Sequence, residues 1–174
     1  MTPAVERFDA ACEAALERLR GRPLADPVFR AASALGDFSV IWFLLGSAWG
    51  LTSARRTDRA LRLALLLGVE SLVVNQGIKR LARRTRPTES GDARYPVRRP
   101  STSSFPSGHA SAGFFAASLL SEGESASAPI WFGMAGVVAT SRAYVRIHHG
   151  SDVVAGAAVG LALAAIAKRA WPVR

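Results

Sequence analysis

Five apolar stretches follow one another along this 174-residue chain, and they constrain its fold more than any other feature. They are Ala31 to Thr52, Leu61 to Ile78, Ser107 to Ser121, Ser125 to Ser141 and Val153 to Ala167. A helix needs about 20 residues to cross a bilayer, with a range of about 17–25. Some of the stretches are short or contain a charge, but together they leave little polar surface for the alternative, a soluble helical domain. We therefore expect an all-α, membrane-embedded bundle of about five transmembrane helices.

The first 27 residues differ from the rest of the chain. Between Thr2 and Arg20, apolar residues recur at intervals of three and four among charged ones, which predicts an amphipathic helix. The segment lacks the uninterrupted apolar run of a secretory signal peptide. Two placements stay open: the helix lies on the membrane interface, or it packs against the remainder of a single domain formed by residues 1–174.

The amino-acid composition limits the classes of protein to which the chain can belong. The chain has 22 Lys and Arg against 13 Asp and Glu, for a net charge of +9, and 49% of its residues are hydrophobic. Such an apolar content excludes a disordered chain, and the lone Cys12 excludes a disulfide scaffold and multi-cysteine metal sites. A strong positive charge is typical of proteins that bind nucleic acid, a membrane surface or an anionic small molecule, so the positions of the basic residues have to distinguish these partners.

The residues able to do chemistry gather at one end of the predicted bundle. If successive helices alternate in direction, the second stretch ends, the third begins, the fourth ends and the fifth begins at the same membrane face. Those four helix ends carry Lys79, Arg86, Ser107, Gly108, His109, Arg142, His148 and Asp152. All three histidines of the chain lie there, at positions 109, 148 and 149. Structural histidines would have no reason to gather at one face, so the grouping predicts a functional site.

The cations of this group indicate what the site binds. Lys79, Arg86 and Arg142 bring three positive charges, more than the nearby acidic residues can neutralise. Arginine guanidinium groups match phosphate oxygens in a bidentate manner. Ser107 and Gly108 follow a proline at a predicted helix start, where free backbone N–H groups and the helix dipole favour an anion. The pattern predicts a site for a tetrahedral oxyanion such as phosphate.

Two histidines beside a bound phosphate suggest a nucleophile and an acid. His148 and Asp152 are four residues apart, so Asp152 can accept the Nδ1–H of His148 and leave Nε2 free to attack phosphorus. His109 can then protonate the departing oxygen. The expected intermediate is a phosphohistidine that water hydrolyses, with no metal and no other cofactor required.

Three sequence motifs of the chain resemble those of the type 2 phosphatidic acid phosphatase superfamily, which also includes the vanadium haloperoxidases. The motifs are Lys79 followed after six residues by Arg86-Pro87, then Pro106-Ser107-Gly108-His109, and finally Ser141-Arg142 followed by His148 and Asp152. The resemblance covers approximately residues 61–167, the motif-bearing core. Larger members usually have six membrane helices. In this chain, the only counterpart of their first helix is the amphipathic N-terminal segment.

The resemblance implies a role for each residue of the site. It implies His148 as the nucleophile, Asp152 as its orienting partner and His109 as the general acid. It further implies that the phosphate ligands are Lys79, Arg86, Ser107, Gly108 and Arg142. The chain would then be a small integral-membrane member of bacterial type that hydrolyses a phosphomonoester or diphosphate on a membrane lipid.

Several substrates and rival functions stay open. Polyprenyl phosphates, polyprenyl diphosphates and polyprenyl sugar phosphates are favoured, with phosphatidylglycerol phosphate and phosphatidic acid as alternatives. A lipid phosphotransferase would pass the phosphate to an acceptor other than water. A non-catalytic binder of anionic lipid or nucleic acid explains the charge but not the histidines. We expect a multi-pass protein of the cell membrane with a lipid substrate and no nucleic-acid partner; the oligomeric state and the membrane side of the site stay open.

Overall fold

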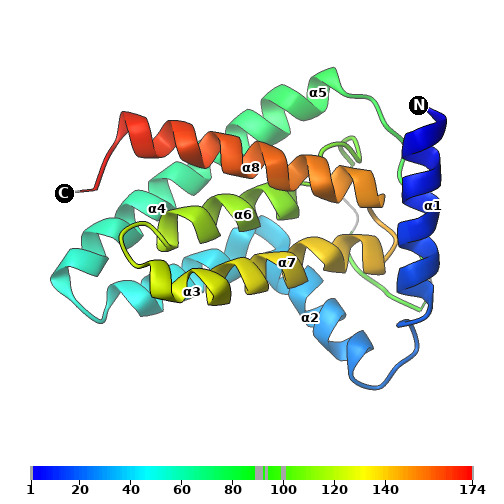
Figure 1. Ribbon diagram of the computed structural model, residues 1–174, viewed down its shortest axis with the longest axis horizontal. Coiled ribbons are helices and arrows are strands. Elements are labelled where there is room, and N and C mark those ends of the chain that lie inside the picture. Colours follow the sequence, from blue (N-terminus) through cyan, green and yellow to red (C-terminus); the bar gives the residue numbers. More distant parts are fainter. Residues whose placement is uncertain (1, 89–91, 93, 99–100, 174) are drawn as a thin grey trace.

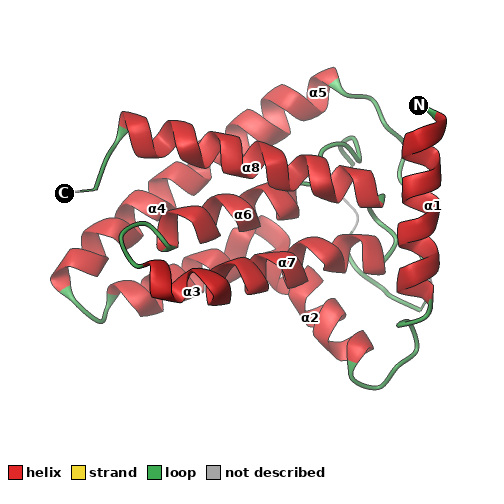
Figure 2. Cartoon of the chain, in the orientation of Figure 1, coloured by secondary structure: helices red, strands yellow, loops and turns green. Residues whose placement is uncertain are grey.

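The computed structural model describes residues 2–88, 92, 94–98 and 101–173, and every regular element in those ranges is helical (Figures 1 and 2). The longer helices are α1 (Pro3–Glu17), α2 (Ala25–Gly36), α3 (Val40–Gly50), α4 (Ala54–Leu72), α6 (Gly108–Leu120), α7 (Ala128–Tyr144) and α8 (Gly150–Ala170). The shorter ones are the 3₁₀ turns η1 (Asp37–Ser39) and η3 (Ser125–Ser127), the π-helical turn η2 (Val73–Ile78) and α5 (Lys79–Leu81). The prediction of an all-α fold is confirmed.

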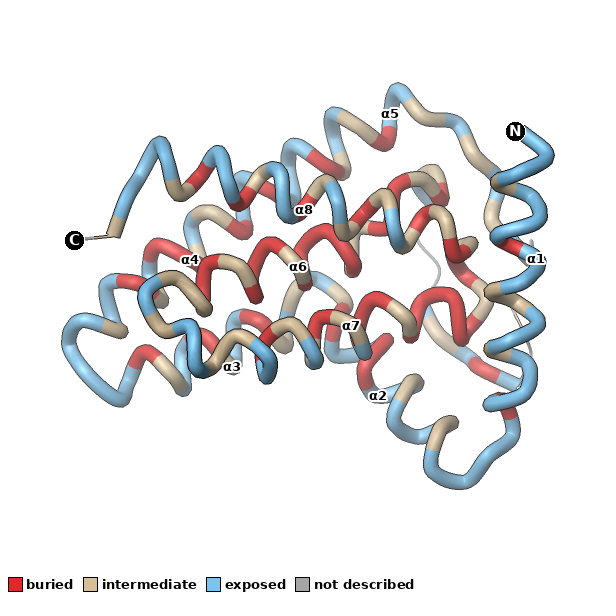
Figure 3. The backbone as a smooth tube through the Cα atoms, in the orientation of Figure 1, coloured by how far each residue is buried: buried red, intermediate tan, exposed pale blue. Residues whose placement is uncertain are grey.

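Three segments in the described part of the chain are long and apolar enough to cross a membrane. They are Ala25–Gly50, Ala54–Leu81 and Gly150–Ala170. The other two predicted spans correspond to α6 and α7, of 13 and 17 residues. Helix α6 lies at the centre of the bundle, where it packs against α3, α4, α7 and α8 and is largely buried (Figure 3).

Small residues let α8 approach α6 very closely. A Cβ added at Gly156 would lie 2.4 Å from the carbonyl oxygen of Ser107, and one at Gly160 would lie 2.2 Å from that of Ser111. No larger side chain fits between the two backbones at these positions, which is the packing that small residues permit between membrane helices. The contact fixes the beginning of α6 against α8.

The first predicted apolar stretch, Ala31 to Thr52, is one helical segment with a sharp break inside it. The helix begins earlier than expected, at Ala25, with Asp26 in its first turn. It is interrupted at η1, where Phe38 and Ser39 adopt positive φ angles of 53° and 60°. Positive φ is uncommon for residues other than glycine and stops a right-handed helix. The break places Asp37 near His109 and Arg142, at the end of the bundle where α6 begins and α7 ends.

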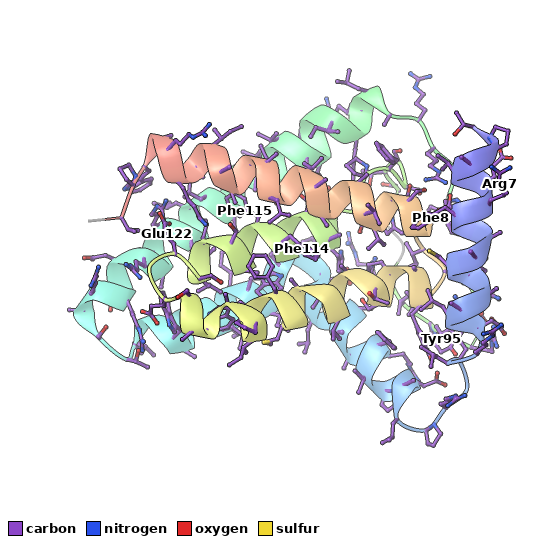
Figure 4. The ribbon with its side chains drawn as sticks, viewed as in Figure 1. Arg7, Phe8, Tyr95, Phe114, Phe115 and Glu122 are labelled. Carbon is purple, nitrogen blue, oxygen red and sulfur yellow. The ribbon has the colours of Figure 1, made fainter. Side chains whose placement is uncertain are left out.

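Helix α1 confirms the predicted amphipathic N-terminal helix and packs across one end of the bundle (Figure 1). It contacts both α7 and α8. Phe8 projects from α1 toward the beginning of α8 (Figure 4), where a Cβ added at Gly150 would lie 3.4 Å from the Phe8 ring and 2.7 Å from the Cys12 sulfur. In this structure, α1 therefore takes the second of the two expected placements, against the rest of the molecule.

The end covered by α1 is also where α5 ends, α6 begins, α7 ends and α8 begins (Figure 1). The opposite end holds Trp49 at the close of α3, Trp131 at the start of α7 and Trp171 just after α8. This distribution places aromatic residues at the far side of the bundle, as expected for a membrane interface. Trp42 instead belongs to the buried core, with 1% of its surface exposed.

Candidate active site

The structure brings the predicted site residues together beneath α1 in a single polar cluster. Lys79, Ser107, Arg142, His148 and Asp152 are all buried there. Lys79 lies within electrostatic range of Arg86, Arg142, Glu70 and Asp152. The contacts described below connect Gly108 and His109 to the same cluster.

The beginning of α6 forms one wall of the site. Ser107 is the N-cap of this helix: its hydroxyl oxygen accepts the backbone N–H of Ala110 at 3.4 Å. Its own N–H donates to the carbonyl oxygen of Asp152 at 3.0 Å, which ties α6 to α8. The first-turn N–H groups of Gly108 and His109 have no acceptor inside an α-helix and are therefore suited to an anion.

Gly108, at the start of α6, faces the ammonium group of Lys79. A Cβ there would lie 3.4 Å from the Lys79 Nζ and 3.5 Å from the Asn75 Oδ1. The bare backbone leaves room for a ligand atom between the helix start and the ammonium. Lys79 is held at this position by α5, directly after the π-helical turn η2, and such turns occur frequently at functional sites.

Arg142 is a buried guanidinium group with one edge unoccupied. Its Nη1 donates to the Ser33 hydroxyl at 2.5 Å and lies 3.8 Å from an Asp37 carboxylate oxygen. Its Nε and Nη2 are buried and have no hydrogen-bond partner among the described residues. These two nitrogens form the edge of the guanidinium group that pairs with phosphate in a bidentate manner. Because an unpaired buried donor is costly, this edge is suited to an anionic ligand.

His148 and Asp152 are adjacent, but they are not joined by the hydrogen bond predicted from the sequence. The Nδ1 of His148 lies 3.6 Å from the Asp152 Oδ2 and has no hydrogen-bond partner among the described residues. That carboxylate oxygen instead accepts the Ser104 hydroxyl and the His149 backbone N–H, the latter at 2.9 Å. Competition from these donors accounts for the longer separation. A shift of a few tenths of an ångström would complete the histidine–aspartate hydrogen bond.

The other nitrogen of His148 faces the cations. Its Nε2 lies 3.4 Å from the Nη1 of Arg86, which also donates to the Ile147 carbonyl at 3.0 Å. Burial lowers the pKa of His148 to about 3, and the charges of Arg86 and Arg142 act in the same direction, against the raising effect of Asp152. The imidazole is therefore neutral at neutral pH. In the neutral tautomer protonated at Nδ1, Nε2 has a lone pair available for nucleophilic attack.

His109 belongs to the same site but has a separate carboxylate partner. Its Nε2 lies 3.3 Å from the Asp37 Oδ1 and 3.2 Å from the Ser33 carbonyl oxygen. Gly36 makes room for the ring, because a Cβ there would lie 2.4 Å from the His109 Cδ2. Ser33 and Asp37 also contact Arg142, so the kink between α2 and α3 positions one histidine and one arginine together.

Two pockets open on the cluster. One of about 320 Å³ has Asp37, Asn75, Gln76, Lys79, Arg98 and His109 in its lining. The other, of about 330 Å³, lies under α1 and has Cys12, Glu13, Pro87, Arg146, His148 and His149 in its lining. The two histidines proposed as acid and nucleophile thus border different openings of the same polar interior.

Several residues at the site were not predicted from the sequence. Asp37 had a recognisable signal, because it is the single charged residue within the first apolar stretch, where a charge is costly. Arg84, which donates to Asp152, was one arginine in a loop that contains many. Ser104 and Asp9 had no distinguishing signal. Glu70 accepts the hydroxyl of Ser111 and so ties α4 to α6. Arg99, another arginine of the same loop, lies outside the described residues.

The chain belongs to the PAP2 superfamily, whose family model matches residues 59–174. This confirms the resemblance found from the three motifs. Two relatives bear the name decaprenylphosphoryl-5-phosphoribose phosphatase. The one from Mycolicibacterium smegmatis is 35% identical over 158 residues, which cover 90% of this chain and 84% of the relative. The one from Mycobacterium tuberculosis is 33% identical over 140 residues, which cover 79% and 75%.

Solved structures agree with the family assignment. The transmembrane PAP2-type phosphatidylglycerolphosphate phosphatase from Bacillus subtilis aligns with a TM-score of 0.71 at 26% identity, covering 97% of this chain and 86% of that chain. LpxE from Aquifex aeolicus aligns with a TM-score of 0.68 at 26% identity, covering 86% and 88%. The protein is a phosphoric ester hydrolase of the lipid-phosphatase type, and it is a membrane protein that acts on a membrane lipid.

Proposed function

We propose that this protein hydrolyses the phosphate of a polyprenyl-linked lipid through a phosphohistidine intermediate, without a metal ion. The observation that carries the proposal is the unoccupied Nε–Nη2 edge of Arg142, buried in the same cluster as the neutral imidazole of His148. A phosphate placed against this edge would satisfy two buried donors. It would also have Arg86, Lys79 and the first-turn N–H groups of α6 to neutralise its remaining charge.

The proposed reaction has two steps. In the first, the His148 Nε2 attacks phosphorus, the P–O bond to the lipid breaks, and the departing oxygen takes a proton from His109. In the second, water attacks phosphorus, the P–N bond breaks, and His148 is released as the neutral imidazole while His109 regains the proton from water. Asp152 orients the imidazole and stabilises its positive charge while the P–N bond exists.

The substrate proposal rests on the relatives and on the lining of the pocket beside Lys79. The two relatives at 33–35% identity are named for a decaprenylphosphoryl phosphoribose substrate, so we propose a polyprenyl sugar phosphate here. Asn75, Gln76, Ser101 and Thr102 give the pocket beside Lys79 amide and hydroxyl groups suited to sugar hydroxyls, and Arg98 adds a positive charge.

Phosphatidylglycerol phosphate is the second candidate substrate, because the Bacillus subtilis neighbour is a phosphatase for that lipid. Its glycerol headgroup is smaller and has fewer hydroxyls than a sugar, so Asn75 and Gln76 would have less to bind. We further propose that residues 1–174 act as one domain and that the helices make several passes through the plasma membrane.

Phosphate release from a panel of lipid phosphates tests the proposal. The panel contains a polyprenylphosphoryl-5-phosphoribose, a polyprenyl diphosphate, phosphatidylglycerol phosphate and phosphatidic acid. Each is assayed with EDTA present. We expect the sugar phosphate to give the highest kcat/KM, and His148→Ala to abolish release. Loss of activity with EDTA, or full activity in His148→Ala, would contradict the mechanism. A preference for phosphatidylglycerol phosphate would contradict the substrate assignment alone. Phosphate transfer that needs an added acceptor would indicate a phosphotransferase.

A further inference from the structure

Helix α1 buries a single residue, and that residue is charged. Asp9 has 9% of its surface exposed, whereas every other residue of α1 is intermediate or exposed. A helix that merely covered the bundle would bury apolar side chains. Asp9 also lies outside residues 59–174, the region matched by the family model.

The Asp9 carboxylate reaches the first turn of α8. Its Oδ1 accepts the backbone N–H of Ser151 at 2.8 Å, and its Oδ2 accepts the Ser151 hydroxyl at 2.9 Å. Ser151 directly precedes Asp152, the partner of His148. A carboxylate at this position satisfies a helix-start donor and interacts favourably with the dipole of α8.

Arg84 joins the same carboxylate to the catalytic pair. Its Nη2 donates to the Asp9 Oδ2 at 2.6 Å, while its Nη1 donates to the Ser151 hydroxyl at 2.8 Å and to the Asp152 Oδ1. The Asp9, Arg84 and Asp152 side chains are only 9%, 13% and 0% exposed. One guanidinium group is thus held between two buried carboxylates, and the second of them faces His148.

The charges of Asp9, Arg84 and Asp152 alternate in sign, so each carboxylate stabilises the guanidinium group between them. Burial alone raises the pKa of Asp9, but the hydrogen bonds from Ser151 and Arg84 outweigh it and hold the pKa below its usual range. Asp9 is therefore ionised at neutral pH and keeps Arg84 in place. Without a second carboxylate, Arg84 would be held by Asp152 and Ser151 alone, and the position of Asp152 would be less constrained.

We propose that Asp9, acting through Arg84, is a positioning residue of the phosphatase site: it fixes Asp152 and the first turn of α8, and so the direction in which His148 presents its Nε2. This rests on the proposed function. Attachment of α1 itself has a separate basis, because Glu13 and Glu17 form ion pairs with Arg20 and Arg146. These ion pairs do not involve Asp9, so α1 stays docked when Asp9 is changed and the effect of Asp9 on the site can be measured separately.

The test uses the whole 174-residue chain and two substitutions that each remove one charge. Asp9→Asn keeps an oxygen that can accept the Ser151 N–H but removes the charge that holds Arg84. Arg84→Gln removes the bridging cation. The matched controls are Glu6→Gln on α1 and Arg83→Gln beside Arg84, two exposed residues. Thermal unfolding in the same detergent shows whether each variant is folded.

We expect Asp9→Asn to lower kcat about 10-fold with KM within twofold, because partners behind a reacting group typically contribute 10–100-fold. The double variant Asp9→Asn/Arg84→Gln should be no slower than Arg84→Gln alone, because Asp9 acts through Arg84. Both controls should keep wild-type kcat. Wild-type kcat in Asp9→Asn, or losses that multiply in the double variant, would overturn the proposal.

A binding measurement separates this proposal from the proposed function. Vanadate is a tetrahedral oxyanion that accepts a histidine nitrogen as a ligand, and its affinity for the site needs no hydrolysis. We expect folded Asp9→Asn to bind vanadate about 10-fold more weakly than Glu6→Gln. If no lipid phosphate is hydrolysed but this difference is found, the proposed reaction fails and the positioning role stands. Equal vanadate affinity in the two variants overturns the positioning role, whatever the activity.

Discussion

The contact between α6 and α8 gives the sharpest prediction, because one added methyl group displaces the site by a distance that follows from the structure. In Gly156→Ala, the new Cβ would lie 2.4 Å from the Ser107 carbonyl oxygen and 3.0 Å from the Ala110 Cβ. Ordinary contact begins at 3.4 Å, so the first turn of α6 has to move by about 1 Å. A displacement of this size at a reacting group lowers a rate by about 10²-fold, and overpacking costs roughly 1–3 kcal/mol of stability.

We expect Gly156→Ala to lower kcat for phosphate release by about 10²-fold and to lower the thermal unfolding midpoint in the same detergent. The matched control is Gly136→Ala in α7, where an added Cβ meets no atom within 4 Å. There the change to alanine stabilises a helix by roughly 0.5–1 kcal/mol and leaves kcat unchanged. Wild-type kcat in a folded Gly156→Ala variant would refute the argument that the approach of α8 sets the position of Ser107.

Three further substitutions test other contacts. Arg142→Lys keeps the charge but loses the planar pair of donors, and we expect kcat/KM for phosphate release to fall by about 10²-fold; Arg169→Lys, exposed at the far end of α8, should change it less than twofold. Ser104→Ala removes a hydrogen bond to Asp152 and should lower kcat about 10-fold at unchanged KM. Because burial lowers the pKa of His148 from 6.5 to about 3, the wild type should lose stability as the pH falls through that window, by at most about 1.4 kcal/mol per pH unit. The glutamine of His148→Gln does not titrate, so this variant should lose less stability than the wild type over the same pH range. Thermal unfolding at each pH measures the difference.

For each of these three predictions, one result would contradict the reasoning. Equal kcat/KM in Arg142→Lys and Arg169→Lys would show that the unoccupied guanidinium edge does not bind phosphate. Unchanged kcat in Ser104→Ala would show that the position of Asp152 does not depend on that hydroxyl. Parallel curves of unfolding midpoint against pH for the wild type and His148→Gln would show that the fold does not oppose protonation of His148.

The bundle and the grouping of the site were predictable because both depend on local sequence. Apolar length predicts helices that can cross a membrane, and alternation of their direction brings Lys79, Ser107, Arg142 and Asp152 to one end. The break at Phe38 and Ser39 was not predictable, because two residues with positive φ have no distinctive composition. It decides where Asp37 lies, and therefore which carboxylate faces His109.

Contacts between distant segments were the part that the sequence did not reveal. In the sequence, Asp9 is indistinguishable from the other polar positions of an amphipathic helix. In the structure it binds Ser151, which is 142 residues away in the chain. The hydrogen bonds of Ser104 and Arg84 to Asp152 likewise span 48 and 68 residues. These donors determine the actual geometry of the histidine–aspartate pair, which the spacing of four residues predicted only approximately.

Trapping of the phosphoenzyme tests the central claim most directly. Enzyme is mixed with a lipid substrate labelled on the scissile phosphate, quenched within milliseconds in alkali, where a phosphoramidate survives, and digested for peptide mapping. We expect the label on the peptide that contains His148, stable in alkali and lost in acid, and absent from His148→Ala. Label on another residue, or hydrolysis at wild-type rate with no label on His148 at any quench time, would contradict the account.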